Sequence, residues 1–358
     1  MPGYLFYMVD GNLLARPFDV SRLEFTGEPV LLAEKVQHFG EVGPSGYGAF
    51  SVSQNGTLAY RSGGTLTTQL TWFDRRGARL ESVGPPGRYD EPALSPDGNR
   101  VAVGRSEPDG LSDIWILERS RGTFSRLTFD PATDATPVWS PGGDRIVYSS
   151  NRAGAFSPFW RLSSGAGDEE QILVGKYIWP DDWSSDGRFI LYEDSGPDTG
   201  SDLAVLPVTG DRKPSSFLKT KFTEMHGQFS PDGRWVAYTS DESGRTEVYV
   251  QPFPPAGGKW QISVDGGGQA SWRRDGREIF YVTPERDLMA VSVSTQSLFK
   301  AGVPQRLFTL PTPDLGLTNS KNNHVVAADG QRILVNTLAE ETSPPIIVVL
   351  NWASILKK

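Results

Sequence analysis

Short apolar stretches separated by glycine-containing turns run along most of this chain. In seven places a large apolar residue leads into such a turn and then into a second apolar stretch. Leu94-Ser-Pro-Asp-Gly98 is one of these turns, and Arg234-Trp-Val-Ala-Tyr238 is one of the stretches that follow. Because Asp-Gly and Asn-Gly adopt positive φ easily, each unit predicts a tight hairpin between two antiparallel strands.

The turns recur at a nearly constant interval. Their fourth positions fall at residues 55, 97, 142, 186, 232, 275 and 329, which lie 42 to 54 residues apart. A period in this range indicates a repeat architecture.

Each repeat carries two further candidate strands. A third apolar stretch follows the hairpin, as at residues 113–117 and 247–250, and a weaker fourth one ends most repeats. Four antiparallel strands in about 45 residues describe a β-propeller blade, which buries both faces against its neighbours. A solenoid uses shorter repeats, and a row of β-sandwiches has a period nearer ~100 residues, so both alternatives fit less well. The predicted fold class is therefore all-β, a β-propeller of four-stranded antiparallel blades.

The repeat covers nearly the whole chain, so we expect a single β-propeller domain over residues 1–358. Complete blades are predicted over about residues 47–310, and partial blades over residues 3–36 and 323–352. The chain length divided by the period favours eight blades, of which the terminal ones are incomplete. Seven blades are the alternative if the two ends share one blade.

Composition narrows the partners and the chemistry. The formal net charge is −8 and no run of Lys or Arg offers a phosphate-binding stripe, so no nucleic-acid partner is expected. The chain has no cysteine, which excludes disulfides and thiolate catalysis. No apolar stretch approaches the ~20 residues that span a bilayer, and the first residues lack the features of a signal peptide. We therefore expect no membrane segment in this chain.

The repeated turns carry a resemblance to a known family. The Ser-Pro-Asp-Gly units at Ser95 and Ser230, with variants at Ser140 and Ser184, resemble the repeats of TolB-type propellers. These propellers form a wide bacterial group related to the tryptophan-aspartate-repeat proteins. The resemblance implies a β-propeller that binds other molecules.

A second resemblance covers essentially the whole chain. The opening Pro2-Gly-Tyr-Leu-Phe-Tyr7 and the closing Val348-Val-Leu-Asn-Trp352 are similar to segments of certain bacterial serine/threonine kinases. In those proteins a catalytic domain and a membrane helix precede a C-terminal propeller. The kinase motifs themselves are absent from this sequence. The resemblance thus implies the sensor or scaffold part, located outside the cytoplasm (periplasmic), while a cytoplasmic location stays open.

The sequence offers no recognised catalytic motif. It contains no Gly-x-Ser-x-Gly nucleophile elbow of the kind that propeller-capped serine peptidases use, no two-histidine helical metal motif and no calcium loop. The repeated turn aspartates, such as Asp97 and Asp232, are interpreted as hairpin residues that bond local backbone N–H groups. We therefore expect that the chain is not an enzyme and has no catalytic residue, cofactor or metal.

The candidate binding site lies in the connections ahead of each first strand. In a propeller these connections return the chain to the axis, so their residues converge on one mouth of the central channel. The residues are mostly acidic and would attract a basic peptide, an amine or a divalent cation, unless they only cap turns in solvent. The candidates are Asp90, Glu91, Asp134, Trp179, Asp181, Asp182, Glu224, His226 and His324.

These observations favour a non-catalytic propeller that binds a ligand or protein, as the sensor or scaffold portion of a bacterial kinase-like signalling protein. The expected partner is a protein or peptide, or a small cationic ligand, and the chain is expected to be a monomer. Two alternatives stay open. One is a free-standing TolB-like adaptor that binds a peptide or protein at the channel mouth. The other is a propeller enzyme, a glycan lyase or hydrolase, with its site in the same funnel.

Overall fold

The computed structural model describes residues 3–9, 11–39, 47–62, 67–107, 110–196, 200–295, 298–312, 317, 321–339 and 345–357. The chain forms two compact units. The propeller unit is Thr68–Leu338, and the small unit is Met1–Thr67 together with Ala339–Lys358. Six of the seven repeated hairpins belong to the propeller unit, and the first belongs to the small unit.

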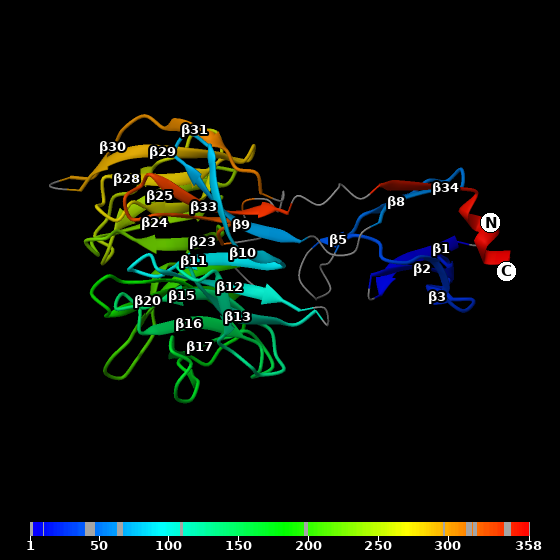
Figure 1. Cartoon of the computed structure of the whole chain (residues 1–358), viewed down its shortest axis with the longest axis horizontal. Helices are drawn as coiled ribbons and strands as arrows, with labels where there is room; N and C mark the ends of the chain where they lie inside the picture. The colour runs from blue at the N-terminus through cyan, green and yellow to red at the C-terminus, as the bar shows by residue number, and fades with distance from the viewer. Residues whose placement is uncertain are drawn as a thin grey trace. The chain divides into compact units, whose positions relative to one another are not determined.

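Within the described residues, the propeller unit contains six antiparallel sheets, which are its blades (Figure 1). Blade 1 comprises, from the inside outward, β32 (His324–Val326), β33 (Arg332–Leu338), β9 (Thr68–Asp74) and β10 (Arg79–Gly87). Blade 2 comprises β11 (Tyr89–Leu94), β12 (Arg100–Ser106), β13 (Ser112–Glu118) and β14 (Thr123–Arg126). Blade 3 comprises β15 (Asp134–Trp139), β16 (Arg145–Ser150), β17 (Ser157–Leu162) and β18 (Glu170–Gln171).

The remaining blades follow in chain order. Blade 4 comprises β19 (Ile178–Trp183), β20 (Phe189–Gly196), β21 (Gly200–Pro207) and β22 (Ser215–Leu218). Blade 5 comprises β23 (Glu224–Phe229), β24 (Trp235–Ser240), β25 (Glu247–Pro252) and β26 (Trp260–Gln261). Blade 6 comprises β27 (Gly268–Trp272), β28 (Glu278–Val282), β29 (Asp287–Ser294), β30 (Lys300–Ala301) and β31 (Gln305–Thr309).

The first and last repeats exchange their third strands. β9 follows the hairpin of β7 (Phe50–Val52) and β8 (Thr57–Arg61) in sequence, but it pairs with β33, with Thr68 opposite Leu338. Conversely, β34 (Ile346–Leu350) follows the hairpin β32–β33 but pairs with β8. The pairing of β9 with β33 completes blade 1 from two distant parts of the chain, and it closes the ring.

The repeated turns have a common hydrogen-bond pattern that explains their sequence. In blade 2, Ser95 Oγ donates to Asp97 Oδ1 (2.6 Å) and accepts from Arg100 N (2.9 Å). The same bonds recur at Ser230, whose hydroxyl donates to Asp232 and accepts from Trp235 N. Gly98 follows with φ of +72°, a conformation that favours glycine. The turn aspartates therefore serve hairpin geometry, as the sequence predicted.

Six hydrophobic cores lie between consecutive blades of the propeller unit. The core between blades 6 and 1, for example, joins Phe280 and Leu288 to Ile333 and Val335. Each other pair of neighbouring blades has a core of the same kind. Because each blade buries both faces, the second strands are almost continuously apolar. The cores also hold the innermost strands around a common axis.

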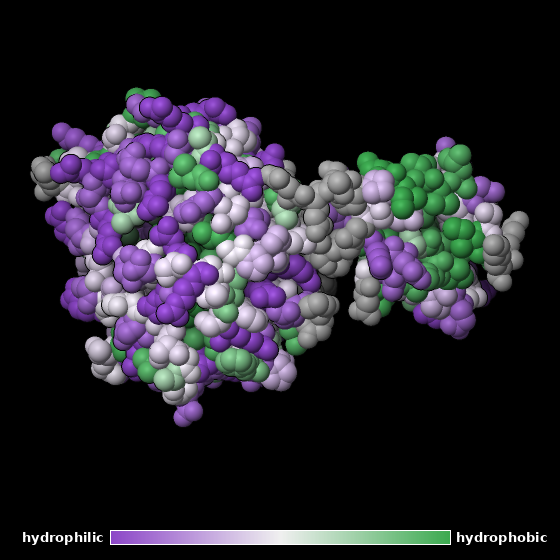
Figure 2. Space-filling model, in the orientation of Figure 1, coloured by the Kyte–Doolittle hydropathy of each residue, from purple (hydrophilic) through white to green (hydrophobic). Residues whose placement is uncertain are grey.

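The described elements of the small unit are β1 (Gly3–Val9), β2 (Asn12–Asp19), β3 (Glu24–Phe25), β4 (Val30–Ala33), β5 (His38–Phe39), β6 (Tyr47–Gly48), β7, β8, β34 and the 3-10 helix η1 (Trp352–Lys357). The described residues of this unit form three sheets, which are β1-β2-β3 with β4, β34-β8-β7, and the pair β5-β6. A core around Leu13, Leu58 and Trp352 joins the first two sheets. Hydrophobic residues gather on the face of this unit that Figure 2 shows, and Leu5, Ile346, Val348 and Leu350 are exposed.

The fold class is confirmed, but the organisation of the chain differs from the sequence prediction. The structure has two units where one domain over residues 1–358 was expected, and its described residues form six blades in the propeller unit where eight, or seven, were expected. The physical reason is the strand exchange. The partial blades predicted at residues 3–36 and 323–352 do not each become a blade, because β32 and β33 join β9 and β10, while residues 3–36 pack within the small unit.

The pairing of β9 with β33 depends on buried side chains of β33. Leu334 on β33 is fully buried (0% exposed) in the core between blades 1 and 2. We expect Leu334→Ala to lower the free energy of unfolding by about 2–5 kcal/mol, since it removes buried contacts and leaves a cavity. Urea unfolding followed by tryptophan fluorescence measures this change.

Leu338 provides the matched control on the same strand, because 43% of its surface is exposed. We expect Leu338→Ala to change the free energy of unfolding by less than about 0.5 kcal/mol. Equal effects of the two substitutions would show that the closing strand is not packed as described.

Candidate functional site

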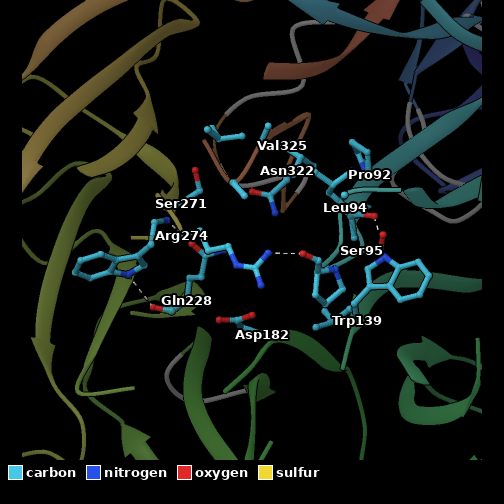
Figure 3. A pocket seen from close by; sticks show the side chains of 18 of the residues that line it. Pro92, Leu94, Ser95, Trp139, Asp182, Gln228, Ser271, Arg274, Asn322 and Val325 are labelled. Atoms are coloured by element: carbon cyan, nitrogen blue, oxygen red, sulfur yellow. Dashed lines mark hydrogen bonds between the residues drawn. The ribbon is translucent and has the colours of Figure 1, made fainter. Parts of the chain in front are cut away.

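A cavity of about 660 Å³ runs along the axis of the propeller unit and takes residues from all six blades. One ring of lining residues occupies the same repeat position, directly before the large apolar residue of each turn unit. In blade order this ring consists of Val325, Ala93, Val138, Asp182, Gln228 and Ser271. Figure 3 labels Val325, Asp182, Gln228 and Ser271 among the lining residues. The ring is apolar on three consecutive blades and polar on the other three, so the channel has an apolar wall and a polar wall.

β-Bulges in the innermost strands shape this cavity. The pairing register shifts within β11, β15, β19, β23 and β27. In four of these bulges a non-glycine residue has positive φ: Glu91, Thr136, His226 and Gln269. A bulge bends the strand and redirects its side chains, and non-glycine residues with positive φ are often found at functional sites. The sequence did not reveal this feature.

Hydrogen bonds between neighbouring innermost strands fix the polar wall. Asp182 Oδ2 accepts from Phe229 N (2.8 Å), and Gln228 Oε1 accepts from Trp272 N (2.6 Å). Asp181 Oδ2 accepts from Gly227 N (2.9 Å) within the bulge of β23. Each of these side chains is therefore held by the backbone of the next blade, which orients the wall without help from a ligand.

Three buried carboxyl groups of blade 4, those of Asp181, Asp182 and Glu193, have raised pKa values. Burial raises the pKa of Asp182 to about 6, although Lys321 and the bond from Phe229 N act in the opposite direction. Burial also raises the pKa of Asp181 and that of Glu193, and these two carboxyl groups are hydrogen-bonded to each other. Asp182 is thus a lining carboxyl group whose pKa lies close to neutral pH.

His324 lines the cavity on blade 1 and is almost completely buried, with 2% of its surface exposed. Neither of its ring nitrogens has a hydrogen-bond partner within the described residues. Burial lowers the pKa of His324 to about 4, so the ring is neutral at pH 7. Two buried hydroxyls on lining residues, Thr136 Oγ1 and Ser271 Oγ, also lack partners among the described residues. An unpaired buried polar atom is costly, so these groups are available to hydrogen-bond a molecule in the channel.

Lys321 reaches across the channel from blade 1 to blade 4. Its ammonium group donates to Pro180 O (3.1 Å) and to Asp181 O, and its backbone N donates to Glu91 Oε1 (3.1 Å). The positive charge lies near the carboxyl groups of blade 4 and lowers the pKa of each of them. Lys321 therefore partly balances the acidic wall.

The structure brings four of the nine sequence-predicted site residues together. Glu91, Asp181, Asp182 and His324 line the cavity. His226 is buried beside Glu193, with Nε2 at 3.9 Å from Glu193 Oε1, and burial lowers its pKa to about 3.

Four other predicted residues do not belong to the lining. Asp90 lies on β11, and burial raises its pKa. Asp134 is ion-paired with Arg152. The ring of Trp179 packs on Phe156, and Glu224 accepts a hydrogen bond from Thr220 Oγ1 (2.5 Å).

Several lining residues were missed from sequence, notably Gln228, Ser271 and Arg274. The repeat pattern of the sequence nevertheless contains a signal that identifies them. The residue directly before the large apolar position and the third residue of the turn both line the cavity in all six blades. Aligning the repeats on the turn therefore identifies two rings of lining positions.

Comparison with known proteins supports the fold. Residues 51–198 match the family model described as the TolB beta propeller domain. The structure of a putative TolB from Agrobacterium tumefaciens has a TM-score of 0.64 at 15% identity, covering 78% of this chain and 100% of that chain. A structure of oligogalacturonate lyase in complex with manganese has a TM-score of 0.50 at 14% identity, covering 85% and 82%. The propeller is therefore TolB-like in fold.

A more similar sequence is the uncharacterized peptidase YuxL of Bacillus subtilis (strain 168). It is 23% identical over 206 residues, which cover 45% of this chain and 31% of that protein. The aligned part thus spans about a third of the relative's length.

The expectation that this chain is not an enzyme is contradicted by these comparisons. A relative named as a peptidase and a lyase with the same fold are among the similar proteins. The absence of a Gly-x-Ser-x-Gly elbow excludes only the serine-peptidase mechanism that uses it. Because one fold can host many different reactions, this absence did not exclude other enzymes.

Among the described residues, no group of three or more His, Cys, Asp or Glu side chains is placed to hold a metal ion. In the same residues no helix has the length and apolar character needed to cross a membrane.

The raised pKa of Asp182 predicts how stability depends on pH. The folded protein binds more protons than the unfolded chain between the ordinary value of 3.8 and about 6, so Asp182 lowers stability as pH rises through this window. We expect Asp182→Asn to raise the free energy of unfolding at pH 7 by about 2–3 kcal/mol, and by nearly nothing at pH 4. Urea unfolding across this pH range measures the difference.

Asp275 gives a control of opposite sign. The hydrogen bond from Arg273 lowers its pKa to about 2, so its charge stabilises the fold at neutral pH and this stabilisation is lost as pH falls toward 2. Asp275→Asn should therefore lower stability at pH 7. If Asp182→Asn also lowered the free energy of unfolding at pH 7, the raised pKa of Asp182 would be contradicted.

Proposed function

We propose that the central channel of this TolB-like propeller binds a peptide or a segment of a protein. The observation that carries the proposal is the ring of Val325, Ala93, Val138, Asp182, Gln228 and Ser271, to which each of the six blades contributes one residue. A cavity with an apolar wall and a few fixed polar groups is typical of a binding site. An extended peptide offers both kinds of group on opposite sides of its backbone.

The polar wall favours a ligand that carries positive charge. Asp182 is ionised above about pH 6, and its Oδ2 already has a fixed donor in Phe229 N. A cation that approaches the carboxylate compensates for its burial, which is why a small amine or a basic side chain suits this wall.

The same cavity supports acid–base catalysis as a second candidate function. A general acid or base works best when its pKa lies near the working pH, and the pKa of Asp182 is about 6. The peptidase-named relative and the lyase of similar fold support testing both substrate classes. If the chain cleaves an oligogalacturonate or a chromogenic peptide anilide, we expect Asp182→Asn to reduce turnover by about 10²-fold or more.

A sensor role outside the cytoplasm extends the binding proposal. Its support is the similarity of the opening and closing segments to propellers that follow bacterial kinase domains. We expect the genomic reading frame to continue upstream into a membrane helix and a kinase domain. An in-frame stop directly before Met1 would contradict this role, and the propeller would then be a free-standing adaptor.

Blocking the channel tests the binding proposal. Ser185 is exposed at the turn of blade 4 and lines the cavity. We expect Ser185→Trp to weaken binding of a peptide selected from a displayed random library at least about tenfold, because the indole fills the mouth of the channel. Fluorescence anisotropy of the labelled synthetic peptide measures the affinity.

Ser164→Trp is the matched control, because Ser164 is exposed in a turn at the outer edge of blade 3. This variant should bind the peptide as the unchanged protein does. Unaltered binding by Ser185→Trp, with both variants equally stable, would place the binding site outside the channel.

A further inference from the structure

The turns of the six blades form a second ring at one end of the cavity. The third residue of each turn lines it, and this residue is proline or a small side chain in five blades. In blade 6 the position is occupied by Arg274. The ring consists of Ala328, Pro96, Pro141, Ser185, Pro231 and Arg274. A single departure from the repeat therefore places a cation on an otherwise uncharged ring.

The guanidinium group of Arg274 lies across the mouth of the channel (Figure 3). It donates a hydrogen bond to Pro96 O on blade 2, past the turn of blade 1. It forms no ion pair with any carboxylate of the described residues. The adjacent Arg273 differs, because it is ion-paired with both Asp275 and Glu278. Arg274 is thus a cation with only a neutral carbonyl as its partner.

Asp182 and Arg274 lie at two levels of the same cavity. Arg274 occupies the turn position equivalent to Ser185, three residues beyond Asp182 in the repeat. β19 ends at Trp183 and Ser185 lies in the turn, so a strand rise of ~3.3 Å per residue sets an upper bound of about 10 Å on the separation of the two levels along the channel. The cavity therefore carries an anionic group at its inner level and a cationic group at its mouth.

The other cations of the lining already have protein contacts. Lys321 donates to two carbonyl groups of blade 4. Arg119 donates to Gly98 O and packs on the ring of Trp72, and Arg332 packs on the same ring. Arg274 differs from these three cations because it lies on the ring of turn residues and its guanidinium group has N–H donors beyond the one bond to Pro96 O.

We propose that the channel takes a short peptide with both termini free, its ammonium group on Asp182 and its carboxylate on Arg274. This inference rests on the proposed function, that the channel binds a peptide. An extended chain spans at most ~3.3–3.6 Å per residue, so up to about three residues bridge the two levels. Guanidinium and carboxylate form paired, charge-assisted hydrogen bonds, and an apolar side chain of the peptide packs on the wall of Val325, Ala93 and Val138. An internal segment of a protein offers neither terminal charge.

The test uses the tripeptide Ala-Val-Ala in four forms: free, N-acetylated, C-amidated and blocked at both ends. Isothermal titration calorimetry measures the affinity of each form for the full chain. We expect either block to weaken binding about tenfold or more, since each removes one charged partner. In Asp182→Asn, acetylation should have no further effect, and in Arg274→Gln, amidation should have none.

Two control variants accompany these measurements. Arg277→Gln and Asp275→Asn lie in the same turn region of blade 6, and neither residue lines the cavity. Both should keep the full difference between free and blocked tripeptide. Thermal unfolding of each variant separates a loss of binding from a loss of fold.

The outcomes distinguish this inference from the proposed function. Equal binding of the free and doubly blocked tripeptide would overturn the assignment of the termini and leave a peptide-binding channel in place. Failure of every tripeptide form, while the selected longer peptide binds in the channel, would also overturn it. If Ser185→Trp leaves the selected peptide bound and no tripeptide binds, both proposals fail.

Discussion

The hydrogen-bonded ladder between β9 and β33 is the constraint on which the rest of the propeller depends. It joins Thr68 to Leu338 and Asp74 to Arg332, so two distant parts of the chain form one sheet. Blade 1 then packs on both blade 6 and blade 2, through Ile333 on one side and Leu334 on the other. Only a closed ring brings six innermost strands around one axis, and the cavity consists of what those strands and their turns contribute. Without the ladder, the lining residues would belong to an open row of sheets.

Local sequence predicted the parts of this fold that local physics determines. The turn at Ser95 follows from a hydroxyl, a carboxylate and a glycine at fixed spacing, and the strands on either side follow from apolar runs. The number of blades was not predictable in this way. Whether β9 pairs with β8 or with β33 depends on a choice between two similar apolar partners, and nothing in the residues near β9 decides it. The period gave the correct number of sequence repeats. The number of blades differs because the first and last repeats exchange their third strands.

For the candidate site, too, the sequence predicted some residues, and others depend on the closed ring. The sequence predicted Asp181, Asp182, Glu91 and His324 because they are polar residues ahead of a first strand. In a propeller these connections converge on the axis, and the four residues line the cavity. His226 and Glu224 were placed there by the same argument, but the bulge in β23 and burial between blades put them elsewhere. Gln228 and Ser271 carry no chemistry that stands out in a sequence. They matter because of the ring they complete, and a ring is a property of the closed fold.

The strand exchange also has a consequence for how the protein is made. Blades 2 to 6 leave the ribosome in order, and each of blades 3 to 6 finds the preceding blade already synthesised. β9 and β10 emerge before all of them, yet their partner β33 is made after blade 6. One face of these strands packs on blade 2, which follows directly, but the edge of β9 that pairs with β33 and the face that packs on blade 6 have no native partner through most of translation. Under this condition nascent chains pair wrongly or aggregate. A holding factor, or temporary pairing of β9 with the adjacent β8, would protect them until the last repeat arrives.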